Sequence, residues 1–298
     1  MFKNILVPLD GSALGEKALN VAIVIAKAFD AKITLLHNIS ITSFTSVGAS
    51  MGEETYQQMA ESEVLNSSDY LKKVEGRLHD CGVAQIETQV VQGIPTSAIQ
   101  LAARNGVDLI VMTTHARTGI ARTILGSVAD EVVHSVNIPV LLIAAQQPAF
   151  ELDGCAPAFQ RILVPLDGST LALQALPIAS ALAQATGAGV VLLDVLPEPV
   201  RAGEELATEG AGWAARYLNE VAHTLPPDTE ADTVVTSENV GEAIVREAVE
   251  RDCDLIVMTT HGRSGFTRMR LGSVADQVLA HAPVPLLLLH GDSTEAAN

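Results

Sequence analysis

The sequence predicts an α/β chain of two tandem doubly wound domains, each built on a five-stranded parallel sheet. The decapeptide KNILVPLDGS at 3–12 returns as QRILVPLDGS at 160–169, and residues 108–130 match residues 254–276 at 17 of 23 positions, which indicates duplication. Each copy alternates short apolar runs with segments of helical spacing, the pattern of a parallel sheet covered by helices. The length of 298 residues suits two domains of roughly 150 residues each.

The first copy opens with a strand, a helix and a second strand. Residues 4–10 (NILVPLD) form a short apolar run that Asp-Gly-Ser ends, which indicates a strand followed by a turn. Residues 16–31 carry apolar side chains at helical spacing, and residues 32–39 (KITLLHNI) form the second strand. Because the strand runs are apolar without alternation, we expect helices to cover both faces of their sheet.

The middle of the copy is expected to hold a loop, a helix and a third strand. Residues 40–58 are rich in Ser, Thr, Gly and Met and show no firm period, which predicts a surface loop, with a lid or partner contact as the alternative. Residues 63–82 predict a helix that Gly82 ends, and the alternating residues 86–93 predict a strand.

The copy ends with two further helix and strand pairs. Residues 97–106 predict a helix, and residues 107–115 (VDLIVMTTH) form a continuous β-rich run. Residues 127–137 begin with the helix-start pattern [ST]-x-x-[DE], and residues 138–145 (IPVLLIAA) predict the fifth strand.

The second copy repeats this order in fewer residues. The offset between the copies falls from 157 residues at VPLDGS to 146 at LIVMTTH, so the second copy lacks 11 residues between these motifs. We expect the first domain over residues 1–147, a polar linker with prolines over 148–159, and the second domain over 160–298.

Composition and charge exclude several classes of function. Lys plus Arg number 18 and Asp plus Glu number 35, and the net charge of −17 disfavours nucleic acid and anionic membranes as partners. The start has no long apolar stretch of the signal-peptide type, and no apolar run is long enough to span a membrane. Cys81, Cys155 and Cys253 are widely spaced and contain no CxxC pair, as expected for reduced thiols in the cytoplasm.

One aspartate follows the first strand of each copy. In doubly wound sheets, ligands bind at the carboxyl ends of the strands where the strand order reverses. Asp10 and Asp167 lie at such an end, where a carboxylate can accept hydrogen bonds from ribose hydroxyls. The alternative is structural, because Asp-Gly-Ser can turn the chain while Ser12 or Ser169 caps the next helix.

A second candidate segment follows the fourth strand of each copy. The pairs Gly126-Ser127 and Gly272-Ser273 are expected at the start of a helix, where unpaired N–H groups attract phosphate. Residues 113–127 and 259–273 contain arginines and no acid in a strongly acidic chain, which also suits a polyphosphate, although pairing with surface carboxylates is the alternative. The chain has neither a Walker sequence nor a G-x-G-x-x-G after the first strand.

These motifs carry a family resemblance. Through VPLDGS near the start of each half and MTTHxRxGxxRxxLGSVAD near its end, the chain resembles a tandem universal stress protein over nearly its whole length. The resemblance implies the adenine nucleotide alpha hydrolase-like fold and, in the nucleotide-binding branch of the family, ATP held by the pattern G-x2-G-x9-G-[ST]. In the first half the implied nucleotide contacts are Pro8, Asp10, Asn38, Met112, Thr113, Ala116, Arg117, Gly126, Ser127 and Val128. In the second half they are Pro165, Asp167, Val195, Met258, Thr259, Gly262, Arg263, Gly272, Ser273 and Val274.

The two halves depart from that pattern to different degrees. Both have threonine for its first glycine, Thr113 and Thr259, and the first half also has Ala116 where the second has Gly262. If Ala116 must adopt positive φ, its Cβ costs on the order of 1 kcal/mol, about fivefold in affinity. We therefore expect the second half to bind ATP, ADP or AMP more tightly, and Mg²⁺ can accompany the nucleotide.

The sequence does not favour an efficient enzyme. His115 and His261 have no nucleophile motif beside them, and the chain contains no metal-binding motif. The resemblance implies a regulatory or stress-tolerance module with at most slow ATP hydrolysis. It also implies that the last strands, at 138–143 and 284–289, join the halves as a pseudo-dimer, and it leaves a homodimer of the whole chain open. The alternative is a structural or assembly protein whose degenerate pockets bind no nucleotide.

Overall fold

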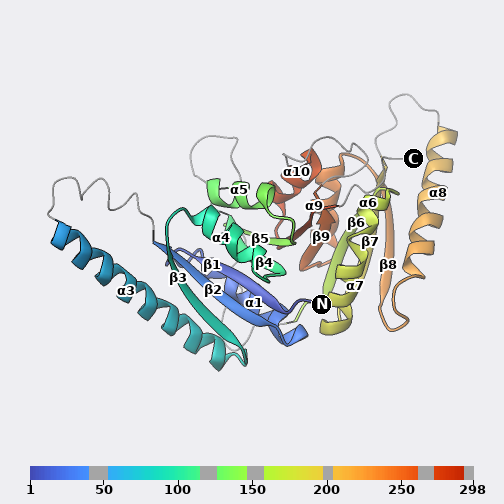
Figure 1. Ribbon diagram of the computed structural model, residues 1–298. Helices are drawn as coiled ribbons and strands as arrows, with labels where there is room; N and C mark the ends of the chain where they lie inside the picture. The colour runs from blue at the N-terminus through green and yellow to red at the C-terminus, as the bar shows by residue number, and fades with distance from the viewer. Residues whose placement is uncertain (40–52, 115–125, 146–157, 197–203, 261–271, 292–298) are drawn as a thin grey trace, which may run out of the picture.

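The structure is a computed structural model that describes residues 1–39, 53–114, 126–145, 158–196, 204–260 and 272–291. Figure 1 shows two α/β halves side by side around one continuous sheet, with helix α3 (Glu53–Asp80) and helix α8 (Glu204–Ala222) at opposite ends. The expected linker lies almost entirely outside the described residues.

The described part of the first half alternates strands and helices as the sequence predicts. Its strands are β1 (Asn4–Leu9), β2 (Lys32–Ile39), β3 (Ile86–Gln92), β4 (Leu109–Thr114) and β5 (Val140–Ala144). Besides α3, its helices are α1 (Lys17–Phe29), α4 (Pro95–Arg104) and α5 (Ser127–Ser135). All five predicted strands are confirmed to within two residues at each end.

The second half repeats this order. Its strands are β6 (Arg161–Leu166), β7 (Gly189–Leu196), β8 (Ala231–Ser237), β9 (Leu255–Thr259) and β10 (Leu286–Leu289). Besides α8, its helices are α6 (Thr170–Leu173), α7 (Leu176–Thr186), α9 (Val240–Glu250) and α10 (Ser273–His281).

The ten strands form one sheet in the order β3-β2-β1-β4-β5-β10-β9-β6-β7-β8. Within each half every pair is parallel, so the predicted doubly wound fold is confirmed. The chain runs outward from β1 through β2 to β3 and then returns to β4 on the other side of β1. The strand order therefore reverses between β1 and β4, and likewise between β6 and β9.

The halves meet at one antiparallel strand pair. Strand β10 lies beside β5, with Leu287 opposite Leu141 and Leu286 opposite Leu142, and all four side chains are fully buried. Helices α1 and α7 also contact each other across this seam. The two parallel sheets predicted from the sequence are thus continuous with each other.

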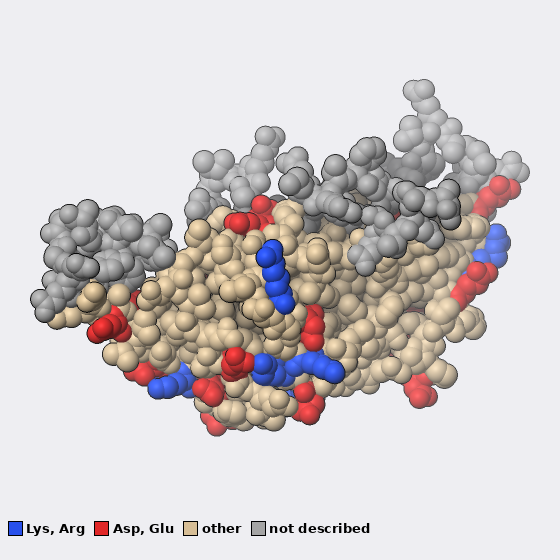
Figure 2. Space-filling model, viewed as in Figure 1, with Lys and Arg blue, Asp and Glu red and all other residues tan. Residues whose placement is uncertain are grey.

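Helices cover both faces of the sheet. Alternate residues of β1 separate into two cores, with Ile5 and Val7 facing the layer of α1, α3, α7 and α8. Leu6 faces the layer of α4, α5, α9 and α10. On the face shown in Figure 2, acidic and basic side chains are interspersed without a single-sign patch. Along the described part of the chain, every helix is too short or too polar to cross a lipid bilayer.

Helix α3 begins earlier than the sequence predicts. The expected loop at 40–58 was wrong at its end, because residues 53–58 belong to α3, while residues 40–52 lie outside the described residues. Most side chains over residues 57–66 are exposed, so this part of the helix has no buried face and no apolar period.

Burial of Cys253 predicts a loss of stability at alkaline pH. The thiol lies just before β9 with 4% of its surface exposed, and burial raises its pKa from 9.0 to about 12. Above pH 9 the unfolded chain loses this proton and the folded chain keeps it, so rising pH favours unfolding, by roughly 1 kcal/mol at about pH 10. Cys253→Val, which introduces the residue found at the aligned Val107, should remove this part of the pH slope in denaturant unfolding. Identical slopes for the two proteins would contradict the prediction.

Candidate functional site

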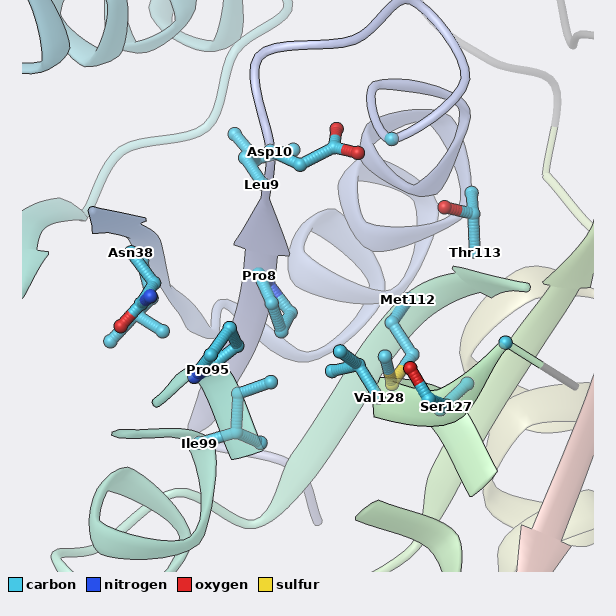
Figure 3. A pocket seen from close by; sticks show the side chains of 14 residues that line it. Pro8, Leu9, Asp10, Asn38, Pro95, Ile99, Met112, Thr113, Ser127 and Val128 are labelled. Carbon is cyan, nitrogen blue, oxygen red and sulfur yellow. The ribbon is translucent and has the colours of Figure 1, made fainter. Parts of the chain in front are cut away.

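A pocket of about 460 Å³ opens where the strand order of the first half reverses. Figure 3 shows side chains from β1, β2, β4, α4 and α5 converging on it. Its wall comprises Pro8, Leu9, Asp10, Gly15, Leu36, Asn38, Pro95, Ile99, Met112, Thr113, Gly126, Ser127, Val128 and Ala129. The two segments that the repeat preserves best therefore meet at one site.

Asp10 directly follows the carboxyl end of β1 and lies in a tight turn. Its Oδ1 accepts hydrogen bonds from the Ser12 backbone N–H at 3.0 Å and the Ser12 hydroxyl at 2.6 Å, and the Ser12 Oγ accepts from the Gly15 N–H. Asp167 and Ser169 repeat these contacts, and Ser169 caps α6. The turn of the structural alternative is thus present in both halves, but the helix cap only in the second, because the N-cap of α1 is Glu16 and not Ser12. A carboxylate can accept about four hydrogen bonds, so this role does not exclude contact with a ligand.

Gly15 allows this turn to lie close to the carboxylate. A Cβ at Gly15 would lie 2.6 Å from Asp10 Oδ1, closer than carbon and oxygen atoms approach. The second half has Ala172 at the aligned position, within α6.

The amino end of α5 forms the opposite wall. Gly126 is the N-cap in an extended conformation, with φ −62° and ψ 153°, and Gly272 has nearly the same angles at α10. The first bond of the helix runs from the Asp130 N–H to the Gly126 carbonyl, so the N–H groups of the three preceding residues have no partner within the helix. These residues, from Ser127 to Ala129, all line the pocket. The helix start was predicted correctly, but the cap is the glycine rather than the serine.

The rest of the wall is mainly apolar. Leu36 and Met112 come from the sheet, Pro95 and Ile99 from α4, and Val128 from α5. The pocket therefore has an apolar end between the sheet and α4, and a polar end between Asp10 and the start of α5 (Figure 3).

The structure brings most of the predicted first-half residues together. Eight of them line the pocket, namely Pro8, Asp10, Asn38, Met112, Thr113, Gly126, Ser127 and Val128. Ala116 and Arg117 lie outside the described residues, as does His115. The sequence missed Leu9, Gly15, Leu36, Pro95, Ile99 and Ala129. The helical residues among them carry no polar motif, so only their packing against the sheet could reveal them.

The second half places its residues on the corresponding elements. Pro165 pairs with Leu193 on β7 as Pro8 pairs with Leu36 on β2, which aligns Val195 with Asn38. The other aligned residues are Asp167, Met258, Thr259, Gly272, Ser273 and Val274. Gly262, Arg263 and His261 lie outside the described residues.

A polar cluster lies beside Asp10 on the other face of the sheet. The Tyr70 hydroxyl donates to Glu16 Oε1 at 3.1 Å, Arg77 forms an ion pair with Glu16 at 2.7 Å, and the His37 ring lies edge-on to Tyr70. Burial, followed by the negative charges of Glu16 and Asp10, raises the pKa of Tyr70 well above 10. Tyr70 is therefore a neutral donor at physiological pH.

The described residues supply no metal centre, because they contain no group of three or more His, Cys, Asp or Glu side chains arranged to hold an ion. Asp10 is the one ionisable side chain among the described residues that line the pocket. The chemistry available there is hydrogen bonding at one end and apolar contact at the other.

Comparison with known proteins identifies the family. The model of the universal stress protein family matches residues 1–144 and again residues 158–290. A universal stress protein of Methanocaldococcus jannaschii is 34% identical over 144 residues, covering 48% of this chain and 82% of that protein. A universal stress protein of Mycolicibacterium smegmatis is 26% identical over 302 residues and 96% of each chain.

A solved structure shows the same fold over the whole chain. The universal stress protein from Archaeoglobus fulgidus superposes with a TM-score of 0.71 at 22% identity, covering 97% of each chain. The repeat, the ten-stranded sheet and two family matches agree, and the chain therefore belongs to the universal stress protein family as a tandem member.

Proposed function

We propose that each half binds an adenine nucleotide at the point where its strand order reverses, and that the chain acts as a nucleotide-dependent regulatory or stress-tolerance module. The observation that carries the proposal is the first-half pocket, which joins an apolar slot to a helix amino end. The slot suits a flat base, and the N–H groups from Ser127 to Ala129 suit phosphate. Asp10 lies between these ends, where it would accept hydrogen bonds from ribose hydroxyls.

The second half is proposed to be the tighter site, because Gly262 replaces Ala116. Its contacts would be the aligned residues, including Pro165, Asp167 and Val195. ATP, ADP and AMP all fit this chemistry, Mg²⁺ can accompany ATP, and we propose at most slow ATP hydrolysis in a cytoplasmic protein.

The β5–β10 seam supports a further part of the proposal, that the two domains (1–147 and 160–298) form an intramolecular pseudo-dimer. A homodimer of the whole chain would need a surface other than this seam, because both strands are already paired on both sides.

One observation favours a second function, a structural or assembly role without nucleotide. Asp10 and Asp167 both hold their turns through Ser12 and Ser169, so the preserved VPLDGS motif has a purely structural use.

Recovery of bound ligand separates the two functions. The purified chain is denatured, the released small molecules are analysed by mass spectrometry, and the melting temperature is measured with and without excess ATP. Recovered adenine nucleotide, together with stabilisation of about 2.7 kcal/mol at 100 times Kd, supports the nucleotide-binding module. An empty protein whose melting temperature ATP leaves unchanged supports the structural role and overturns the proposal.

A further inference from the structure

Helix α3 is joined to the start of α1 by three side chains that do not line the pocket. The Tyr70 hydroxyl donates to Glu16 Oε1 at 3.1 Å, and Arg77 Nη1 donates to Glu16 Oε2 at 2.7 Å. Each oxygen of the Glu16 carboxylate therefore has its own donor from α3, and two contacts fix its position. We call these three residues the Glu16 cluster.

Glu16 is connected to Asp10 through its neighbour Gly15. The Glu16 N–H donates to the Ser12 carbonyl at 3.2 Å, and the Gly15 N–H donates to the Ser12 hydroxyl at 3.0 Å. Gly15 lies so close to Asp10 Oδ1 that a Cβ on the glycine would be 2.6 Å from it, and both residues line the pocket. A displacement of Glu16 would therefore move the backbone beside the Asp10 carboxylate.

The donors of the Glu16 cluster come from the packed half of α3. Figure 1 shows this helix alongside β3, the edge strand of the sheet. Most side chains over residues 57–66 are exposed, whereas Tyr70 and Arg77 lie further along the helix. The buried core beneath that part includes three of its side chains, Leu71, Val74 and Leu78. Packing of α3 on the sheet thus brings both donors to Glu16.

The second half keeps the tyrosine but not its partners. Tyr217 precedes the buried residues Leu218, Val221 and Leu225, which repeat the spacing of Leu71, Val74 and Leu78. Glu16 aligns with Leu173, at the offset of 157 residues that VPLDGS also shows. Arg77 aligns with Thr224, whose hydroxyl donates to the Val221 carbonyl. The carboxylate that joins the helix to the turn is therefore particular to the first half.

We infer that Glu16 is a positioning residue of the first site: held by Tyr70 and Arg77, it keeps the Asp10 turn in place and makes nucleotide affinity depend on the packing of α3. The inference rests on the proposed nucleotide binding. A carboxylate that is already held in place loses less freedom when a ligand binds, so the cluster raises affinity without touching the nucleotide. Exposed ion pairs contribute little to folding stability, and the Arg77 side chain is 44% exposed, so the effect should appear mainly in binding.

The test measures ATP binding by calorimetric titration of the full-length chain, with the second site weakened by Asp167→Asn. Glu16→Leu introduces the residue found at the aligned Leu173, and we expect ATP to bind roughly fivefold more weakly at the first site. Because Glu16 acts through Asp10, the same substitution should have almost no effect once Asp10→Asn is also present. An equal loss in both backgrounds, or a lower melting temperature with unchanged affinity, would overturn the inference.

A matched control breaks a similar ion pair away from the site. Lys32 and Glu87 lie 2.6 Å apart near the amino ends of β2 and β3, whereas the pocket lies at the carboxyl ends of the strands. Glu87→Leu should leave ATP affinity unchanged. A loss as large as that from Glu16→Leu would count against the inference, because the effect would not be specific to the Glu16 cluster.

Tyr70→Phe keeps the test decisive if Glu16→Leu fails to fold. It removes one hydroxyl and keeps the ring that lies edge-on to His37, and we expect the first site to bind ATP roughly threefold more weakly. Unchanged affinity would then overturn the inference. Absence of ATP binding in the unsubstituted chain would overturn the proposed function and this inference together. ATP binding that neither Glu16→Leu nor Tyr70→Phe weakens would overturn this inference alone.

Discussion

Asp167→Asn should remove the tighter phase of ATP binding, and Asp10→Asn the weaker phase, each with a loss of roughly 10- to 100-fold in affinity at its own site. A hydrogen bond to a charged acceptor is worth about 1.5–3 kcal/mol, and this sets the expected size. Asparagine keeps one carbonyl oxygen, so the bonds from Ser12 or Ser169 that hold the turn can survive. The change therefore tests the charge and not the turn. Calorimetric titration of each variant with ATP measures both losses.

A matched control lies at the opposite edge of the same sheet. Asp108 accepts hydrogen bonds from the N–H groups of Lys3 and Asn4, at the amino end of β1. Asp108→Asn should lower the melting temperature without changing the affinity for ATP. Loss of the tighter phase in Asp10→Asn instead of Asp167→Asn would contradict the ranking of the sites, and no loss from either would contradict a role for the carboxylates in binding.

Gly15→Ala tests whether the position of the Asp10 carboxylate matters for binding. The new Cβ would lie 2.6 Å from Asp10 Oδ1, so the carboxylate must move and the first site should weaken while the second is unaffected. Gly76→Ala is the control, because a Cβ there meets nothing within 4 Å and Gly76 lies in α3. Weakening by Gly76→Ala of the same size would show that the effect of Gly15→Ala is not local.

The sequence predicted the strands well because their signal is burial on both faces. Strands β4 (LIVMTT) and β5 (VLLIA) consist entirely of buried residues, and most of these are apolar in the sequence. Because the repeat contains each strand twice, the second copy supported each prediction made from the first. The start of α3 could not be predicted in this way, because a helical turn with no buried face leaves no period in the sequence.

The residues of the candidate site also differ in whether the sequence alone could identify them. Asp10, Thr113 and Ser127 belong to preserved polar motifs at strand ends, and the sequence placed them together. Pro95 and Ile99 line the pocket because of how α4 packs on the sheet, and they belong to no motif that the repeat preserves. Asn38 was identified by resemblance, but the orientation of its amide follows from Gly93, 55 residues away in the chain.

Leu287→Ala should lower the free energy of unfolding by about 2–5 kcal/mol, the usual cost of a cavity at a fully buried leucine. Leu287 lies in β10 opposite Leu141 of β5, and neither side chain is exposed. Leu65→Ala is the control, because that leucine is 67% exposed on α3 and should change stability by less than about 0.5 kcal/mol. Urea unfolding followed by circular dichroism measures both.

The same leucine pair tests whether the halves are joined in solution as one sheet. If they are, Leu141→Ala and Leu287→Ala should each shift the same transition, and the double variant should depart from additivity by about 0.5–3 kcal/mol, as residues in contact do. If the halves instead unfold independently, each substitution will shift a separate transition and the two effects will add. Because Leu141 and Leu287 lie opposite each other at the seam and belong to the same core, an additive result would contradict a continuous sheet. The coupling energy is thus a direct measure of the seam that unites the tandem domains.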